Sequence, residues 1–429
     1  MSGNGAIAGQ AWITGSVGVI FLGMLLGQPT VTAIGTVLLV TLGLSWLWNR
    51  HVLDRLIFER RAENDRCFAG ETLPLTLRLT NKKFIPMPWV RVEDSLSSRV
   101  RVRDWEAYQT ESAGTQVVSF FTALRWQERI TWHLRVQCPR RGYHRIGPVS
   151  VRSGDPFGFF TRTQELPGEL YLTVYPKLVP LEELGLPPRY LLGEQAVRRP
   201  VITDPTRIIG IREYRPEDPF RAIHWKASAR AGSYQTKIFE PTANLQVAIF
   251  LNLDTISRPY EGLDQDHLER AISVAASVAQ WATDHKYAVG IYANGLLAQT
   301  GQTLRVPPGR SPDQFLRILE GLARLTPFTH MNIAGTLEKE TPHFPWGSTV
   351  LIVTMTMSDP LRAAIARLAG RGLRVVIVAL GFVDALALPG VTTHRLPWEA
   401  VEPIARDGGN GDDDAATDTK ANDVARAAD

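Results

Sequence analysis

Charge is missing from the start of this 429-residue chain: no Asp, Glu, Lys or Arg precedes Arg50. The uncharged stretch holds two apolar runs, residues 11–26 and 31–48. Each run is near the ~20 residues that a helix needs to cross a bilayer. Because residues 28–30 include a proline between the runs, we expect a turn there and an antiparallel pair of transmembrane helices. A single span or a cleaved signal peptide is the alternative, but a signal peptide begins with charge and is not followed by a second apolar run.

Tryptophan and arginine flank this segment. Trp12 stands near one end, and Trp46 and Trp48 stand near the other, as in an interfacial aromatic belt. Five arginines follow the second run: Arg50, Arg55, Arg60, Arg61 and Arg66. Positive charge beside a span favours the cytoplasmic side. We therefore expect a multi-pass protein of the plasma membrane, with the lipid bilayer as one partner and the soluble body in the cytoplasm.

Cysteines and catalytic motifs are scarce. Cys67 and Cys138 are the two cysteines, and neither lies in a C-x-x-C or Cys/His cluster, so they indicate a reducing compartment and no metal site. Spacing leaves open whether they meet in space. The sequence contains no phosphate-binding G-x-x-x-x-G-K-[ST], no H-E-x-x-H and no G-x-S-x-G. A net charge of +4 is too small to indicate nucleic acid.

The soluble body changes character along its length. Residues 51–180 alternate short strands with turns, as in 72–80, and predict an antiparallel β-sandwich. Residues 181–206 are rich in proline and arginine and predict a linker on the surface. Residues 207–404 alternate buried strands with helices and predict a doubly wound α/β sheet. Residues 405–429 are small, polar and acidic, and predict a disordered tail.

The most distinctive segment is residues 210–230, which contains R-E-Y-R-P-E-D-P-F-R-A-I-H-W-K-A-S-A-R and is followed by K-I-F-E-P at 237–241. This order resembles the hallmark of a prokaryotic family called domain of unknown function 58. Other stretches look like landmarks of the same family, among them 141–148 and 155–158. The resemblance implies a membrane hairpin, a β-sandwich and a von Willebrand factor A-like domain. It also implies the company of MoxR-type AAA+ ATPases and other membrane proteins, and no assigned activity.

Within the signature, charged and aromatic residues are the candidates for function. They are Arg212, Glu213, Tyr214, Arg215, Asp218, Arg221, His224, Trp225, Lys226, Arg230 and Glu240. Asp218 followed by Pro219 predicts a helix start, with Phe220 and His224 near one face. The cations suit an anion site or an acidic partner. Alternatively, the arginines pair with neighbouring carboxylates and Trp225 fills a seam between domains.

A metal site is tested by the D-x-S-x-S pattern that many A-like domains use for Mg²⁺. Asp254 supplies the first ligand, but Ile256 and Arg258 stand at the two serine positions. A later aspartate would fall near Met355, and Thr329 matches the threonine only loosely. Because a hard cation needs several oxygen ligands, we expect no metal and no cofactor.

Two functional hypotheses follow. The first is a non-enzymatic, membrane-tethered interaction or scaffold protein that works with a MoxR-type ATPase in assembling envelope or protein complexes. The second is an uncharacterised hydrolase or anion sensor that uses the basic segment around His224. A weaker third reading places the sandwich outside the cell, where an impermeant reagent would label an accessible thiol.

Overall fold

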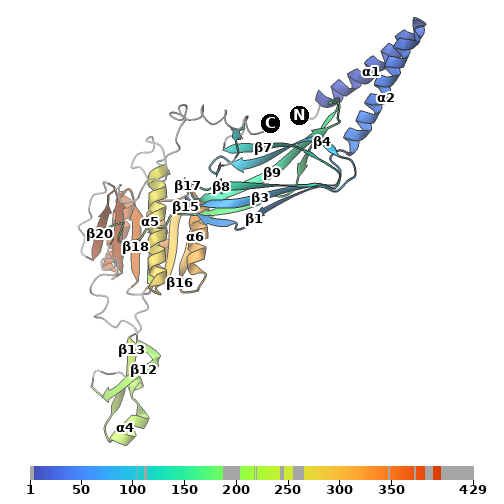
Figure 1. The fold of residues 1–429 in the computed structure, drawn as a ribbon. Coiled ribbons are helices and arrows are strands. Elements are labelled where there is room, and N and C mark those ends of the chain that lie inside the picture. Colours follow the sequence, from blue (N-terminus) through green and yellow to red (C-terminus); the bar gives the residue numbers. More distant parts are fainter. Residues whose placement is uncertain are drawn as a thin grey trace, which may run out of the picture. The chain divides into compact units, whose positions relative to one another are not determined.

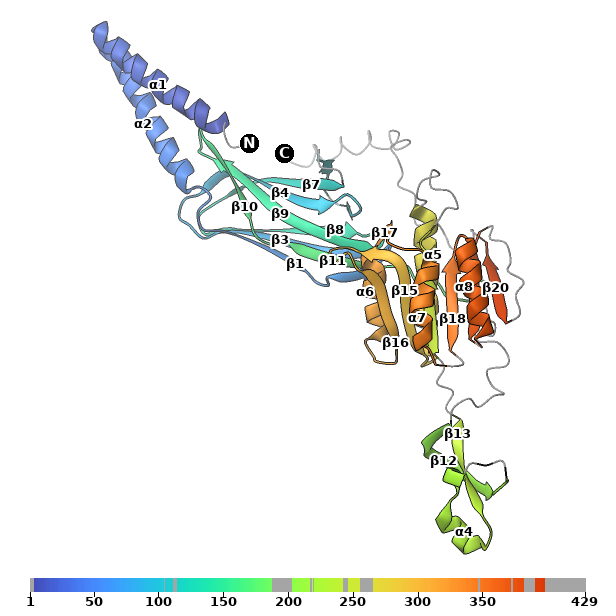
Figure 2. The ribbon, with the colours of Figure 1, turned by 180° about the vertical axis from the view of Figure 1, so that it is seen from behind.

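The computed structural model describes residues 4–103, 105–110, 114–186, 203–216, 218, 220–241, 246–254, 265–345, 348–371, 373–381 and 390–397. It forms two compact units, Met1–Tyr175 and Pro176–Asp429. Figure 1 labels the elements, and Figure 2 gives the view from behind. The expected tail at 405–429 and most of the expected linker lie outside the described residues.

The chain opens with two apolar helices, α1 (Asn4–Leu25) and α2 (Pro29–His51). The predicted turn is shorter than expected: Pro29 begins α2, where its missing N–H is not needed. The helices are antiparallel, and a Cβ on Gly23 would lie 2.7 Å from the Thr32 backbone nitrogen. A Cβ on Gly35 would likewise lie 3.0 Å from the nitrogen of Ile20. By length and composition α2 could cross a membrane, while the apolar part of α1, Trp12–Leu25, is shorter.

The β-rich part of this unit is a sandwich of two sheets. The first sheet has the order β1-β3-β8-β5: β1 (Leu56–Ala62), β3 (Thr72–Asn81), β8 (Arg129–Gln137) and β5 (Arg101–Val102). The second has the order β2-β11-β9-β4-β7-β6, with β10 beside β9: β2 (Arg66–Phe68), β11 (Leu170–Tyr175), β9 (Gly142–Gly154), β4 (Met87–Ser97), β7 (Thr115–Leu124), β6 (Ala107–Gln109) and β10 (Thr161–Leu166). The prediction of a purely antiparallel sandwich was wrong at one edge, where β2 pairs with β11 in parallel.

One apolar core holds the two sheets together. Alternate residues of β3, such as Leu75 and Leu77, meet Val92 of β4 and Val151 of β9 in a single buried cluster. The cluster also takes in Val52 and Leu53, the two residues that follow α2. The helix therefore runs directly into the sandwich core, which fixes its end to the β domain.

The second unit contains a sheet of mostly parallel strands, in the order β16-β15-β14-β18-β19-β20 with β17 beside β15. The strands are β14 (Gln246–Leu251), β15 (Ala288–Leu297), β16 (Thr303–Gly309), β17 (Leu325–Thr329), β18 (Thr349–Thr354), β19 (Arg374–Leu380) and β20 (Val391–Leu396). The helices are α5 (Gln265–Asp284), α6 (Gln314–Arg324), α7 (Ile333–Glu340), which runs into a short 3-10 turn at Thr341–His343, and α8 (Asp359–Gly370). Helices α7 and α8 share one buried cluster with the sheet, and α5 covers the other face (Figures 1 and 2). The predicted α/β sheet is therefore present.

The beginning of the expected linker is not a solvated segment. Leu181, Leu184 and Leu186 are buried, and the backbone N–H of Val179 donates to Ser277 Oγ of α5 at 2.9 Å. Proline and arginine content concealed these apolar residues, which recur at short intervals. Residues 178–182 line a cavity of about 370 Å³ with α5, so this stretch packs on the α/β unit.

Candidate functional site

The signature forms a hairpin and a short helix. Strands β12 (Thr203–Glu213) and β13 (Gln235–Pro241) pair antiparallel, and α4 (Trp225–Ala231) lies between them in sequence after a 3-10 turn at Phe220–Ala222. The predicted helix start at Asp218 was wrong. His224 caps α4, because its Nδ1 accepts the backbone N–H of Ala227 at 3.1 Å. Phe220 therefore shares no α-helical face with His224.

Asp218 organises the turn instead of capping a helix. Its Oδ1 accepts from the Arg212 guanidinium at 2.5 Å, and its Oδ2 accepts from the backbone N–H of Arg215 at 2.9 Å and from Thr236 Oγ1 at 3.3 Å. The bond from Arg212 holds the pKa of Asp218 below its ordinary value, and the bond from Arg215 adds to the effect. The predicted pairing of arginine with a neighbouring carboxylate is confirmed for this pair.

A second set of bonds closes the hairpin around α4. Ser228 Oγ donates to the His224 carbonyl at 3.1 Å and accepts the backbone N–H of Gln235 at 2.9 Å. The His224 backbone N–H donates to the Gln235 carbonyl at 2.7 Å. Because its Nδ1 is a bond acceptor, the His224 ring carries its proton on Nε2 when neutral. These bonds give His224 and Ser228 a structural role.

Four aromatic side chains gather on this small element, and we call them the aromatic cluster: Tyr214, Phe220, Trp225 and Tyr234. Ring centroids are 5.9 Å apart for Tyr214 and Phe220, and 6.4 Å apart for Trp225 and Tyr234. Phe220 is 77% exposed, Trp225 66% and Tyr234 61%. Trp225 is therefore largely exposed on this element.

Cations flank the aromatic cluster. The side chains of Arg215, Lys226 and Arg230 are exposed, as is that of Glu213. The side chains of Arg221 and Glu240 lie outside the described residues. The structure thus joins most of the predicted signature residues on one element. Sequence reasoning missed Tyr234, although its place opposite Tyr214 follows from the hairpin pairing.

The carboxyl edge of the α/β sheet, where a metal site was tested, carries a closed polar network. Asn252 Nδ2 donates to Thr354 Oγ1 at 3.0 Å, and Asn294 Nδ2 donates to Asn252 Oδ1 at 3.2 Å. Asn294 Oδ1 accepts the backbone N–H of Leu253 at 2.9 Å. Asn252, Asn294 and Thr354 are buried. Each of these side-chain oxygens therefore already accepts a hydrogen bond from a neighbouring N–H group. Asparagine at the end of an apolar strand was the signal that could have found them.

Asp254 follows the network and is half-buried. Burial raises its pKa above the ordinary value, and a hydrogen bond from Asn294 opposes the shift. Thr329 is exposed at the end of β17, and Met355 is buried. Ile256 and Arg258 lie outside the described residues. Among the residues that the structure describes, no group of three or more His, Cys, Asp or Glu could hold a metal ion.

We expect magnesium to leave the thermal unfolding of the α/β unit unchanged. The side-chain oxygens of Asn252, Asn294 and Thr354 near Asp254 already accept hydrogen bonds from neighbouring N–H groups. Asp254 would therefore lack the further oxygen ligands that magnesium needs. The measurement is a thermal melt of the purified chain in excess MgCl₂ and in EDTA. A saturable rise of the melting temperature with magnesium, lost in Asp254→Asn, would contradict this expectation.

The two cysteines, whose meeting in space the sequence left open, lie together inside the sandwich. Cys67 lies on β2 and Cys138 directly follows β8, and both are free and buried. A hydrogen bond between the thiols lowers the pKa of Cys67, whereas the same bond and burial raise the pKa of Cys138. Because both side chains are buried, an impermeant thiol reagent cannot report which side of a membrane the sandwich occupies.

The chain is similar in sequence or structure to several known proteins. Across 267 residues the chain is 26% identical to the uncharacterized protein YeaD of Bacillus subtilis (strain 168), which covers 62% of this chain. The chain spans 61% of the length of that relative. Solved structures with some similarity include the CARDB domain of the PF1109 protein from Pyrococcus furiosus (14% identity, 28% of this chain, 91% of that chain, TM-score 0.19). Another is a non-cellulosomal cohesin from Archaeoglobus fulgidus (10% identity, 28% of this chain, 90% of that chain, TM-score 0.19). These low scores carry no argument about function.

The family comparison bears directly on the signature. Residues 210–397 match the family described as "Protein of unknown function DUF58". The matched range begins at the hairpin with the aromatic cluster and runs through the α/β sheet to the end of β20. The resemblance predicted from the signature is confirmed: residues 210–397 of this chain belong to the DUF58 family.

Proposed function

We propose that this chain is a non-enzymatic, membrane-tethered interaction protein, and that the aromatic cluster is its recognition surface. One observation carries the proposal: Phe220, Trp225 and Tyr234 are each more than 60% exposed on a hairpin that is closely bonded internally. Exposed aromatic groups are costly unless a partner covers them, and Trp, Tyr and Arg are the residues that dominate protein interfaces. A rigid support keeps the entropic cost of binding low.

The membrane anchor is proposed as a hairpin in which both α1 and α2 cross the bilayer. Apolar side chains such as Phe21, Leu25 and Val37 are largely exposed on these helices. The hydroxyls of Thr36 and Thr41 donate to backbone carbonyls four residues earlier, at 2.8 Å each, so these groups are satisfied within the helix. Close approach at glycine is how helices pack in lipid. These features support the hairpin.

The orientation is proposed with the body in the cytoplasm. Arg50 in the last turn of α2, and Arg55 and Arg61 beyond it, are exposed, as the positive-inside tendency requires. Arg60 does not count toward this charge. Its side chain is 2% exposed and paired with Asp94, so the basic cluster is smaller than the sequence indicated.

The partner is proposed as a MoxR-type AAA+ ATPase that acts with other membrane proteins in assembling envelope complexes. This step rests on the family resemblance and on the cations around the aromatic cluster, which suit an acidic surface. The α/β sheet is proposed as von Willebrand factor A-like, which its parallel strands β15, β14, β18, β19 and β20, with β16 antiparallel beside β15, support. A hydrolase using His224 has less support, because its Nδ1 is already occupied as the helix cap.

The proposal is tested by binding of the detergent-solubilised chain to a MoxR-type ATPase from the same organism. We expect Trp225→Ala and Phe220→Ala each to weaken binding by about 30-fold, because a buried aromatic anchor contributes about 2 kcal/mol. Phe328→Ala is the matched control, because Phe328 is 69% exposed on β17 and lies outside the aromatic cluster.

Two outcomes would count against the proposed function. If neither aromatic variant weakens binding more than Phe328→Ala does, the aromatic cluster is not the recognition surface. If the wild-type chain neither binds the ATPase nor changes its rate of ATP hydrolysis, the proposed partner is wrong.

A further inference from the structure

An apolar groove lies where α2 enters the sandwich. It has a volume of about 550 Å³ and is lined on one side by α2, with Leu44, Leu47 and Trp48. The opposite side comes from two loops of the sandwich, with Ile85 and Phe157. All of these residues belong to the first unit, and the groove opens beside the part of α2 that is proposed to leave the bilayer. A groove at this level faces the boundary between acyl chains and headgroups.

Polar atoms without partners surround the groove. Ser45 is 2% exposed and lines the groove, and its hydroxyl has no hydrogen-bond partner in the described part of the chain. The same is true of the indole nitrogen of Trp48. Buried polar groups of this kind are rare because each costs free energy when left unpaired. An apolar groove with unpaired donors fits a ligand that has both an apolar chain and polar oxygens.

A buried lysine, Lys83, lies in the β3–β4 loop two residues before the groove residue Ile85. Lys83 is 6% exposed, and its ammonium has no hydrogen-bond partner among the residues described. Burial lowers the pKa of Lys83 to about 8, and Asp54 only partly opposes the shift. Asp54 in turn accepts a hydrogen bond from the groove residue His51 at 2.8 Å. A buried cation without a close anion calls for an external negative group.

The loops beside the groove are rigid and present aromatic side chains outward. Asn81 Nδ2 donates to the carbonyls of Ile85 (3.0 Å) and Arg125 (2.9 Å), which ties the β3–β4 loop to the β7–β8 loop. Buried Asp155 accepts three backbone N–H groups of the β9–β10 loop. The loops expose three aromatic side chains: Phe84 (78%), Trp126 (66%) and Phe157 (65%). Aromatic side chains are favoured at the headgroup level of a bilayer.

We propose that this end of the sandwich is a phospholipid site, in which an anionic phospholipid places one acyl chain in the groove and its phosphate near Lys83. The inference rests on the proposed membrane anchor, and it adds a ligand and a surface to it. Arg50, which is exposed and directly precedes the groove residue His51, matches the negative charge of such a lipid. The loop aromatics Phe84, Trp126 and Phe157 rest in the same bilayer surface.

The test measures thermal unfolding of the full chain in neutral detergent with added palmitoyl-oleoyl phosphatidylglycerol, the matching phosphatidylcholine, or inorganic phosphate. We expect phosphatidylglycerol alone to raise the melting temperature. Lys83→Met should melt higher than wild type without lipid, since a buried unpaired charge is gone, and should lose the gain from phosphatidylglycerol. Lys82→Met is the matched control: it removes the same charge from an exposed neighbour and should keep the gain. Ser45→Phe, which fills the groove from α2, should also lose the gain.

The lipid site would be overturned if phosphatidylglycerol raised the melting temperature equally in Lys83→Met and Lys82→Met. It would also be overturned if phosphatidylcholine or inorganic phosphate raised the melting temperature of wild type as much as phosphatidylglycerol does. A separate measurement tests the proposed membrane anchor itself. A fluorophore on Leu38→Cys in α2 should be quenched by doxyl-labelled lipid in nanodiscs, and the buried Cys67 and Cys138 leave this label site-specific. No quenching would overturn the membrane anchor. Quenching without discrimination between the lipids would overturn the lipid site alone.

Discussion

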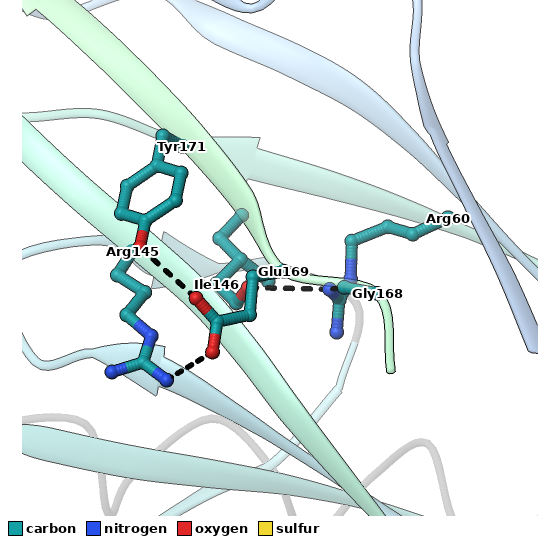
Figure 3. A network of polar contacts seen from close by, with 6 residues as sticks. All are labelled: Arg60, Arg145, Ile146, Gly168, Glu169 and Tyr171. Atoms are coloured by element: carbon teal, nitrogen blue, oxygen red, sulfur yellow. Dashed lines mark hydrogen bonds and ion pairs between the residues drawn. The ribbon is translucent and has the colours of Figure 1, made fainter. Parts of the chain in front are cut away.

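Replacing Asp94 by alanine is expected to destabilise the sandwich by about 3–5 kcal/mol, because it leaves the Arg60 guanidinium buried without its anion. Both side chains are 2% exposed, and Arg60 donates to Asp94 Oδ1 at 2.5 Å. Arg60 also donates to the carbonyls of Ile146 (3.2 Å) and Gly168. These carbonyls satisfy N–H groups of Arg60 but do not neutralise its charge (Figure 3).

The pair itself adds little to stability, and its chemistry explains why. Burial raises the pKa of Asp94 to about 6, although the Arg60 charge opposes the shift. The carboxylate is therefore ionised at neutral pH at a cost in desolvation that the ion pair only partly offsets. We expect the double variant Arg60→Met with Asp94→Leu to be far less destabilised than Asp94→Ala.

Hydrogen exchange of peptides from β4 and β9 in the full chain measures this effect, because it reports opening of the sandwich alone. Glu169→Ala is the matched control. Glu169 pairs with Arg145 and accepts from Tyr171 Oη at 3.0 Å near the same network, but at the surface (Figure 3). Exposed ion pairs contribute little to stability, so hydrogen exchange in Glu169→Ala should stay close to that of wild type. Equal exchange in Asp94→Ala and Glu169→Ala would show that burial of the Arg60 pair does not matter.

Arg60 also shows what sequence patterns leave hidden. It was grouped with the arginines beside the membrane because it follows α2 closely, yet β1 turns it inward toward Asp94, which is 34 residues away. The same holds for Asn252 and Asn294, which are 42 residues apart and meet at the carboxyl edge of the sheet. Contacts between residues so distant in sequence depend on strand order and register, which local patterns do not contain.

Local patterns predicted the elements that bury apolar runs. The buried strands expected within residues 207–404 are present, as at β19, because a buried parallel strand reads as a continuous apolar run. The edge strands β16 and β20, which are more exposed and polar, were not predicted, and neither was the short helix α7. In the signature, the pattern of helix start followed by proline was misleading, because the Asp218 carboxylate bonds Arg212 and the real cap is His224. The exposure of Trp225 could not be read from the sequence, since a tryptophan is buried more often than not.

Acidification is expected to destabilise the sandwich through His144. This ring is 3% exposed, and its Nε2 has no hydrogen-bond partner within the described ranges. Burial lowers the pKa of His144 to about 4, while a backbone hydrogen bond to Arg140 opposes the shift. The ring packs closely against Gly142 of β9, where a Cβ would lie 2.6 Å from it. The folded chain therefore holds His144 neutral where the unfolded chain protonates it.

The sign of the effect follows from proton uptake. Above pH 6.5 the imidazole is neutral in both states, and the contribution of His144 to stability is complete. As pH falls from 6.5 to 4, only the unfolded chain takes up the proton, so about 3 kcal/mol is lost. Asp94 acts in the opposite direction, because its raised pKa makes the folded chain take up a proton first, near pH 6. The wild-type pH profile alone therefore mixes two titrations.

A difference between two profiles isolates the histidine. Hydrogen exchange of β9 peptides is measured from pH 7 to pH 4 in wild type and in His144→Gln, with rates corrected for the intrinsic pH dependence of exchange. Wild type should lose about 3 kcal/mol relative to the variant over this range, while Asp94 contributes equally to both. Parallel profiles would mean that the His144 ring is protonated in the folded sandwich as readily as in the unfolded chain. The cost of burying the charged ring would then have to be offset by a hydrogen bond from Nε2, which has no partner among the described residues.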